Sequence, residues 1–308
     1  MDFLDALNEN DGQEFKRIAY DPSPHARFRL YGFIHERREI AKKIALNRVP
    51  VTQEVYDKYK EGIGKVVKRE SDAEKVFNEF TIARTYRTPS SYRLALPGSS
   101  IKGSISTAYQ EKLYKKSGNY DSVKRQMLTP GEDNLFRHLL IADASAKRES
   151  AAIAYVKNVK RNIERECISN LLEVIRADTV FETTITIKRT LEIGDIASGC
   201  NSHYKPILYS MFDKKTDPNT LRSIGSDFAA KQAQLQLANN HFLLRIGRHS
   251  GARACTVDGM RRIKVKTAAQ NYEIGDEETT VWLYQGNEPK RAAPLGWFLC
   301  EYRDADNI

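Results

Sequence analysis

The chain has 308 residues and carries 49 Lys and Arg against 40 Asp and Glu, a net charge of +9 that favours a polyanionic partner. Its 41% hydrophobic residues are enough for packed cores and exclude wholesale disorder, and the length suits about two domains. No run approaches the roughly 18 apolar residues that span a bilayer, and the first residues are acidic where a signal peptide is basic, so we expect a cytoplasmic protein without a membrane segment.

The N-terminal part is predicted to be mainly helical. A loop around residues 21–24 precedes helical patterns over residues 36–45 and 53–61, and a strand-like pattern follows over residues 80–84. This region carries no motif that indicates a particular chemistry.

The segment LPGSSIKGSI, which begins at Leu96, combines glycine, hydroxyl and lysine residues where a helix is predicted to begin. The residues before it alternate like a short strand, and apolar residues recur at helical spacing after it. We therefore expect Pro97 to end the strand and Gly98 to adopt a backbone angle that other residues resist. Ser99 or Ser100 would then cap the helix.

Several interpretations compete for the lysine of this segment. Lys102 beside the free amides of a helix N-terminus would favour a phosphate. A nucleotide-binding P-loop fails, because its lysine must follow the last glycine, whereas Lys102 precedes Gly103. Ser99 and Lys102 have the S-x-x-K spacing of penicillin-binding-type serine hydrolases, but the accompanying S-D-N and K-T-G motifs are absent from the sequence. A helix cap that binds nothing explains this segment equally well.

The elements that follow alternate irregularly between strand and helix. Strands are predicted at residues 139–143, 152–159 and 180–188, a helix at residues 221–239, and strands near residues 243, 281 and 298. This order predicts an α+β fold. The irregular alternation and the lack of a G-x-G-x-x-G motif argue against a doubly wound parallel sheet with a dinucleotide site.

The densest basic stretch runs from Arg245 to Lys266 and contains a single acid, Asp258. It opens with an apolar run that predicts a buried strand and then breaks into the glycine-bracketed loop GRHSG, residues 247–251. The two glycines let the backbone approach a ligand, while Arg248 and Ser250 can reach phosphate oxygens. A hairpin turn with solvated arginines explains the same pattern.

His249 raises the question of catalysis, because an imidazole beside an arginine can act as a general acid or base in RNA cleavage. The other histidines show no familiar catalytic spacing, and no H-E-x-x-H motif or tight carboxylate cluster predicts a metal site. We interpret His249 as a binding or structural residue and expect no metal and no cofactor. An endoribonuclease that uses His249 is the alternative.

The four cysteines, Cys167, Cys200, Cys255 and Cys300, lie far apart and include no C-x-x-C pair. This spacing argues against a zinc knuckle and against a dense disulfide framework. We expect four buried thiols.

Three short motifs occur in order along the chain: PGSSIKG from Pro97, IGRHSG from Ile246 and PLGWF from Pro294. Together they resemble the RAMP proteins of type III CRISPR effector complexes, most closely the fifth subunit of the type III-A Csm complex, over residues 79–302. The resemblance implies an α+β fold of two ferredoxin-like (RRM-like) units. We place them at residues 1–170, with a helical insertion, and at residues 171–308, with the glycine-rich loop.

The same resemblance implies a non-catalytic structural subunit of an antiviral ribonucleoprotein. It would bind CRISPR RNA, cap the 3′ end of this guide beside neighbouring RAMP subunits, and support the guide's maturation, with a host nuclease as a further candidate partner. The RNA-binding residues expected from the motifs are Gly98, Ser99, Ser100, Lys102, Gly103, Gly247, Arg248, His249, Ser250 and Gly251. Charge alone adds Arg253, Arg261, Arg262 and Lys264. A repeating backbone subunit that cleaves target RNA is a further alternative, and Trp297 is expected to pack in the core.

The N-terminus departs from the family pattern. Such proteins open with a strand and a glycine-containing loop before the acidic helix that residues 1–10 resemble, and no such strand is present here. Because the first strand of a ferredoxin-like sheet is central, its loss would leave backbone groups unpaired. We therefore expect a first unit that is incomplete at its N-terminus or rebuilt, or that is completed by upstream residues or another polypeptide.

Overall fold

The computed structural model describes residues 3–23, 26–66, 81–128, 134–147, 150–161, 168–188, 191–215, 217–266, 271–284 and 288–304. The helices are α1 Glu9–Ala19, α2 Ala26–Glu36, α3 Arg38–Ile44, α4 Gln53–Val66, α6 Gly98–Ser117, α7 Tyr120–Met127, α8 Ile193–Ser210, α9 Pro218–Ser223 and α10 Ser226–Ala233, with 3-10 turns η2 Leu135–His138, η3 Arg253–Cys255 and η4 Pro289–Arg291. The strands are β1 Ala95–Leu96, β2 Leu139–Ile141, β3 Ala144–Ala146, β4 Ala151–Lys160, β5 Ile168–Ile175, β6 Phe181–Glu182, β7 Ile185–Ile187, β8 His241–Arg245, β9 Ile263–Lys266, β10 Tyr272–Gly275, β11 Thr280–Tyr284, β12 Ala293–Pro294 and β13 Trp297–Glu301. Helices and small antiparallel sheets confirm the α+β class, whereas the number of ferredoxin-like units stays a prediction.

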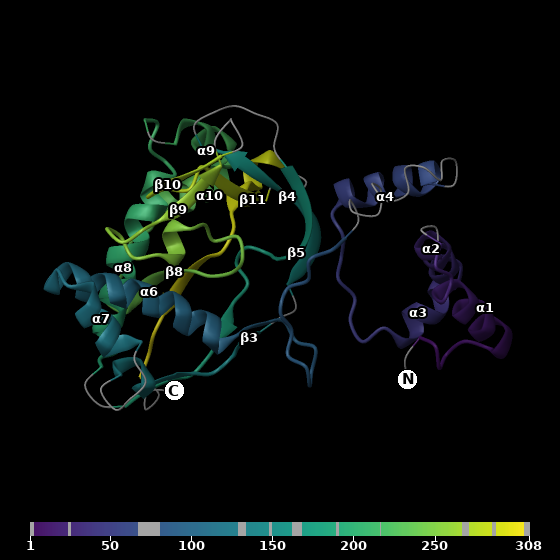
Figure 1. Ribbon diagram of the computed structural model, residues 1–308, viewed down its shortest axis with the longest axis horizontal. Helices are drawn as coiled ribbons and strands as arrows, with labels where there is room; N and C mark the ends of the chain where they lie inside the picture. Colours follow the sequence, from purple (N-terminus) through teal and green to yellow (C-terminus); the bar gives the residue numbers. More distant parts are fainter. Residues whose placement is uncertain are drawn as a thin grey trace.

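Helices α1 to α3 lie beside the main body, and the segment after α3 returns to it at β4, where α4 begins (Figure 1). Phe15 of α1 packs on Phe33 of α2 with ring centroids 5.8 Å apart, and Val55 of α4 packs on Tyr155 and Leu171 in the β4–β5 hairpin. The helices predicted at residues 36–45 and 53–61 are confirmed as α3, with the end of α2, and as α4. Over the described ranges, none of the helices has the length and apolar character needed to cross a membrane.

The largest sheet has the strand order β12-β11-β4-β5, with antiparallel neighbours throughout. Strands β4 and β11 confirm the predictions at residues 152–159 and near residue 281. The expected boundary at residue 170 lies within β5, and the sheet combines strands from both sides of it. The division into two units stays a prediction.

The main core lies among α6, α8 and the antiparallel pair of β8 and β13. Ile105 of α6, Tyr204 of α8 and Leu244 of β8 are all buried there. The Tyr204 hydroxyl donates to Ser104 O at 3.0 Å, which joins the two helices by a hydrogen bond within this apolar layer. Helix α6 therefore has a fixed position against α8 and β8.

Two predicted elements are each divided in the structure. Residues 180–188 form β6, which pairs with β3, and β7, which pairs with β2, because the chain changes partner at Thr183, whose hydroxyl donates to Ala142 O at 2.6 Å. The helix predicted at residues 221–239 becomes α9 and α10. Gly225 lies between them, where an added Cβ would come 2.2 Å from Lys290 O, so this backbone passes η4 too closely for a longer helix.

The thiols are mostly, but not all, sequestered. Cys200 is buried and Cys300 is half-buried, and burial raises the pKa of the Cys300 thiol to about 12. Cys255 is exposed, which corrects the expectation of four buried thiols. Cys167 and Phe80 lie outside the described residues, and beyond Phe80 the predicted strand at residues 80–84 is reduced to a single bridge between Ala83 and Leu172.

Candidate nucleic-acid interface

Helix α6 begins at a close backbone approach. A Cβ on Gly98 would lie 2.2 Å from Ile141 O, so glycine is needed for the helix to start against the end of β2. The φ angle of Gly98 is not positive, which corrects the conformational reason expected for this glycine. Pro97 occupies the N-cap position, so Ser99 and Ser100 lie exposed within the first turn and do not cap the helix.

The carboxylate of Asp143 occupies the start of α6. The Gly98 N–H donates to Asp143 Oδ1 at 2.8 Å, where the positive end of the helix dipole favours an anion. Lys102 Nζ donates to Leu139 O at 2.8 Å beside a groove of about 510 Å³. The sequence interpretation required free amides at the start of the helix, but the first of them, that of Gly98, is bonded to Asp143. Ser99 and Lys102 remain as polar groups along the groove.

The glycine-bracketed loop forms a tight turn directly after β8. Gly247 and Gly251 have φ angles of 112° and 83°, a region that favours glycine. Ser250 is buried, and its Oγ donates to Gly247 O at 2.7 Å. The hydroxyl therefore closes the turn, which corrects its expected role as a phosphate ligand.

Arg248 and His249 differ in their surroundings, although they are adjacent in the loop. Arg248 is exposed, whereas the His249 ring packs on Trp282 of β11 with ring centroids 4.6 Å apart. Burial, together with the neighbouring charge of Arg248, lowers the pKa of His249. The histidine is therefore held as a neutral packed ring at pH 7, and Arg248 is the charged group that the loop presents to solvent.

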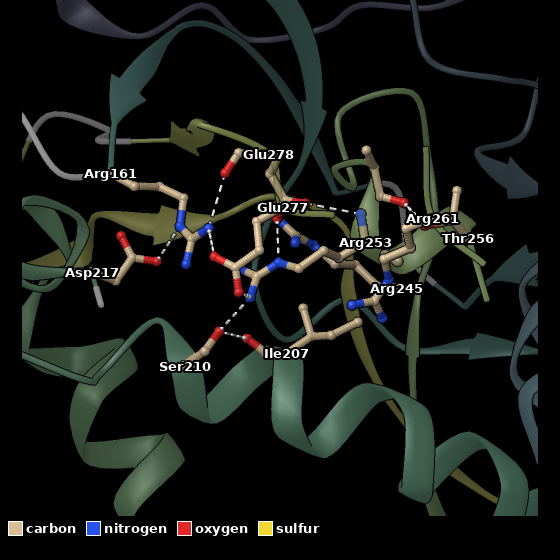
Figure 2. Close-up of polar contacts among 12 residues, drawn as sticks. Arg161, Ile207, Ser210, Asp217, Arg245, Arg253, Thr256, Arg261, Glu277 and Glu278 are labelled. Carbon is tan, nitrogen blue, oxygen red and sulfur yellow. Dashed lines mark hydrogen bonds and ion pairs between the residues drawn. The ribbon is translucent and has the colours of Figure 1, made fainter. Parts of the chain in front are cut away.

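A buried ion pair lies beneath the loop. Arg253 donates its backbone N–H to Glu278 Oε2 at 2.9 Å and its Nε to Glu278 Oε1 at 3.0 Å, with its side chain only 5% exposed. Burial alone would raise the pKa of Glu278, but the charge and hydrogen bonds of Arg253 lower it. Figure 2 shows these side chains above the end of α8, from which the Ser210 hydroxyl accepts from Arg253 Nη1. Arg253 is thus an internal structural residue, which corrects its assignment to RNA binding.

Arg245 is also buried, in the last position of β8. Its Nε donates to Leu295 O at 3.2 Å, and its guanidinium lies 5.1 Å from the Trp297 ring centroid. Burial lowers the pKa of Arg245 to about 10, so the group stays protonated at neutral pH. Trp297 packs against the core cluster, as expected, and Gly251 covers Arg245 from the loop side, with its Cβ position 3.4 Å from Nη1.

A third arginine completes the network shown in Figure 2. Arg161, directly after β4, donates to Asp217 Oδ2 through Nε and to Glu277 Oε2 through Nη1, both at 2.7 Å. Its Nη1 also donates to Glu278 O at 2.9 Å. Arg161 and Arg253 thus share the acids Asp217, Glu277 and Glu278, and these three acids balance the charges of Arg161, Arg245 and Arg253.

The three sequence motifs meet around Arg245. Ser104 Oγ, just beyond the first motif, donates to Arg245 O at 3.1 Å. The Ile246 N–H donates to Gly296 O at 2.8 Å, and a Cβ on Gly296 would lie only 2.6 Å from Ile246 O. Segments that are far apart in the sequence therefore form one continuous structural unit.

The remaining basic residues lie on the segment that leads into β9. Arg261 is largely enclosed and pairs with Asp258 at 3.0 Å, so its charge is offset locally. Arg262 and Lys264 are exposed. Together with Arg248 they are the candidate residues whose charge faces solvent most directly.

The sequence did not reveal the two acids that hold the start of α6 and Arg253 in place. Asp143 and Glu278 lie in segments without a recognisable motif, and only the close approach of distant chain segments reveals their partners. Within the ranges that the structure describes, no group of three His, Cys, Asp or Glu side chains has the arrangement of a metal site.

Replacing Gly98 with alanine is expected to destabilise the protein by about 1–3 kcal/mol, because the new Cβ would force α6 away from Ile141 O. Gly103 in the same helix is the matched control, because nothing lies within 4 Å of its Cβ position. Gly103→Ala should stabilise by about 0.5–1 kcal/mol through helix propensity. Urea unfolding of the full chain measures both, and equal effects would contradict the proposed close approach.

No protein-family model matches the sequence, and comparison with curated proteins gives no match. Among solved structures, the chain is similar to a chain in a cryo-EM structure of a Csm–crRNA–target RNA ternary complex of a type III-A CRISPR-Cas system, with 13% identity, a TM-score of 0.45, and coverage of 68% of this chain and 73% of that chain. It is also similar to the crystal structure of Csm5 from T. onnurineus, with 15% identity, a TM-score of 0.42, and coverage of 56% of this chain and 66% of that chain.

Proposed function

We propose that this chain is a non-catalytic RNA-binding structural subunit of a type III-A (Csm) CRISPR effector complex. The observation that carries the proposal is the convergence of the three RAMP-like motifs on Arg245, which leaves Arg248 exposed on a glycine-bracketed turn. An arginine on such a turn is suited to bidentate contact with phosphate oxygens. Binding through the backbone suits a guide RNA, whose specificity comes from base pairing with its target.

In the fuller form of the proposal, the subunit caps the 3′ end of CRISPR RNA, contacts neighbouring RAMP subunits and supports guide maturation, in which a recruited host nuclease would do the trimming. The packing of His249 on Trp282 supports a binding role over a catalytic one, because an aromatic contact holds the ring. Among the residues that the structure describes, none forms a hydrogen bond or ion pair with the His249 ring. Chemistry would then reside in other components of the complex.

The wild-type chain is expected to bind single-stranded RNA with a steep salt dependence, and Arg248→Ala should reduce the slope of log affinity against log salt by about 0.7, the effect of one lost phosphate contact. Fluorescence anisotropy of a labelled RNA across a salt series measures this slope. Arg125→Ala is the control, because Arg125 is an exposed arginine on α7. An unchanged slope for Arg248→Ala would contradict the site.

The same mixtures, incubated with chelator and resolved by length, test the enzymatic alternative. RNA should remain intact with the wild-type chain. Cleavage that persists in chelator and disappears in His249→Ala would instead establish an endoribonuclease.

Co-purification with the products of neighbouring genes, followed by RNA sequencing, tests the assembly: the proposal requires CRISPR RNA in the purified material, and its absence would overturn it.

A further inference from the structure

A second polar and aromatic surface lies on the hairpin of β9 and β10. These strands pair only with each other among the described strands, in the register Tyr272↔Lys266 and Ile274↔Lys264. Directly paired residues of an antiparallel ladder share a face, and so do residues two apart along a strand. Lys264, Tyr272 and Ile274 therefore lie on one face of the hairpin.

This face is the outer one. Tyr272 is 66% exposed and Ile274 is 55% exposed, and Lys264 is exposed as well. On the opposite face, Ile263 and Val265 are half-buried, whereas Glu273, which pairs with Val265, is exposed. Arg262 is exposed and continues the alternation of Lys264 at the start of β9. The hairpin thus exposes a tyrosine ring and an aliphatic side chain on the same face as the basic residue Lys264, with Arg262 continuing this face beyond Lys264, while the two aliphatic residues of the opposite face are partly covered.

The hairpin is rooted in the network beneath the glycine-bracketed loop. Its first strand follows η3, which contains Arg253, and its second strand leads directly into Glu277 and Glu278. Because Glu278 holds the backbone and side chain of Arg253, the segments that lead into and out of the hairpin are joined at this buried ion pair. The outer face therefore has a defined position relative to the turn that presents Arg248.

We propose that the outer face of the β9–β10 hairpin is a second RNA-binding surface, on which an unpaired base stacks against Tyr272 while Lys264 and Arg262 contact the adjoining phosphates. The inference rests on the proposed RNA-binding function and extends it from backbone contact at the loop to base stacking at the hairpin. An aromatic ring flanked by basic residues is suited to single-stranded nucleic acid, because every base offers a π-face and each phosphate carries a negative charge. Positive charge beside the ring favours this occupant over an apolar protein surface.

The test uses the full chain and two labelled probes of equal length, a short oligouridine and its abasic ribose-phosphate analogue. Tyr272→Ala should weaken binding of the oligouridine by roughly tenfold, the effect of losing one base stack, and should leave the abasic probe unaffected. Tyr272→Phe should retain wild-type affinity because the ring is kept. Tyr20→Ala is the control for loss of an exposed tyrosine, since Tyr20 is 85% exposed at the end of α1.

The outcomes separate this inference from the function on which it rests. Equal affinity of Tyr272→Ala and wild type for the oligouridine would overturn the stacking surface, while a reduced salt slope in Arg248→Ala would still support RNA binding by the loop. Equal weakening of both probes would also overturn it, because stacking requires a base. Loss of co-purifying protein subunits with unchanged RNA affinity would assign the face to a protein partner and reject the RNA surface. If wild type binds neither probe, the proposed function itself fails.

Discussion

Replacing Glu278 with glutamine is expected to lower the free energy of unfolding by about 3–5 kcal/mol, because removing one member of a buried ion pair leaves its partner uncompensated. Among the described residues Arg253 would keep Glu277, at 3.6 Å, as its one acidic partner, and Arg245 would lose the carboxylate charge that offsets its burial. Glutamine has nearly the same shape as glutamate. The expected loss is therefore electrostatic and not a consequence of an empty cavity.

The adjacent acid provides the control. The Glu277 side chain is 52% exposed, so its pairs with Arg161 and Arg253 are screened by water, and Glu277→Gln should lower the free energy of unfolding by less than about 1 kcal/mol. Urea unfolding followed by circular dichroism at neutral pH compares the two variants. Equal destabilisation would show that burial does not set the importance of Glu278.

Glu278→Gln should also affect the interface in a way that a merely destabilised protein would not. Gly251 lies against the Glu278 carboxylate, with its Cβ position 3.3 Å from Oε1, so weakening this contact frees the turn that carries Arg248. Under conditions where the variant remains folded, its RNA affinity should therefore depend less steeply on salt, as in Arg248→Ala. A wild-type slope would assign Glu278 to stability alone.

The sequence indicated the motif positions well because their signals are local. A proline and glycine before a helical pattern located the start of α6, and two glycines around polar residues located the turn after β8. Both patterns reflect backbone requirements within a few residues. The reason for Gly98 could not be deduced in the same way, because Ile141 O comes from a strand more than 40 residues later in the chain.

Which arginines face solvent was not predictable from charge density. Arg253 and Arg248 lie five residues apart in the same basic stretch, yet one is buried against Glu278 and the other is exposed. Strand β5 was missed for a related reason, because Glu173 interrupts its apolar pattern. The structure buries Glu173 against Arg84 and Arg87, at 2.5 and 2.6 Å, which come from a segment almost 90 residues earlier.

Glu111, in the second half of α6, connects this helix to α8 and to the basic segment that leads into the hairpin. Its Oε2 lies 2.6 Å from His203 Nδ1 in α8 and accepts from the Asp258 N–H at 2.9 Å, while its Oε1 accepts from Lys115 at 2.6 Å. Burial alone would raise the pKa of Glu111, but these hydrogen bonds and the charge of His203 together lower it to about 2. The ionised carboxylate therefore holds α6, α8 and the segment before β9 together.

Because the pKa of Glu111 falls from 4.5 to about 2 on folding, ionisation of this group should contribute about 3 kcal/mol of stability above pH 4.5. This contribution is lost progressively as the pH falls from 4.5 toward 2, where the folded-state carboxyl also becomes protonated. Glu111→Gln lacks the contribution at every pH. The free energies of unfolding of wild type and Glu111→Gln should consequently differ by about 3 kcal/mol at pH 7 and by only about 1 kcal/mol at pH 3.

Urea unfolding at pH 7, 5, 4 and 3 measures this convergence, with Asp121→Asn on α7 as the control. The Asp121 side chain is 87% exposed, so this variant should follow the wild type at each pH. A difference between wild type and Glu111→Gln that stays constant down to pH 3 would mean that shape and hydrogen bonding matter at this position, and not charge. Convergence would establish the ionised carboxylate as the group that ties α6 to the segment before β9.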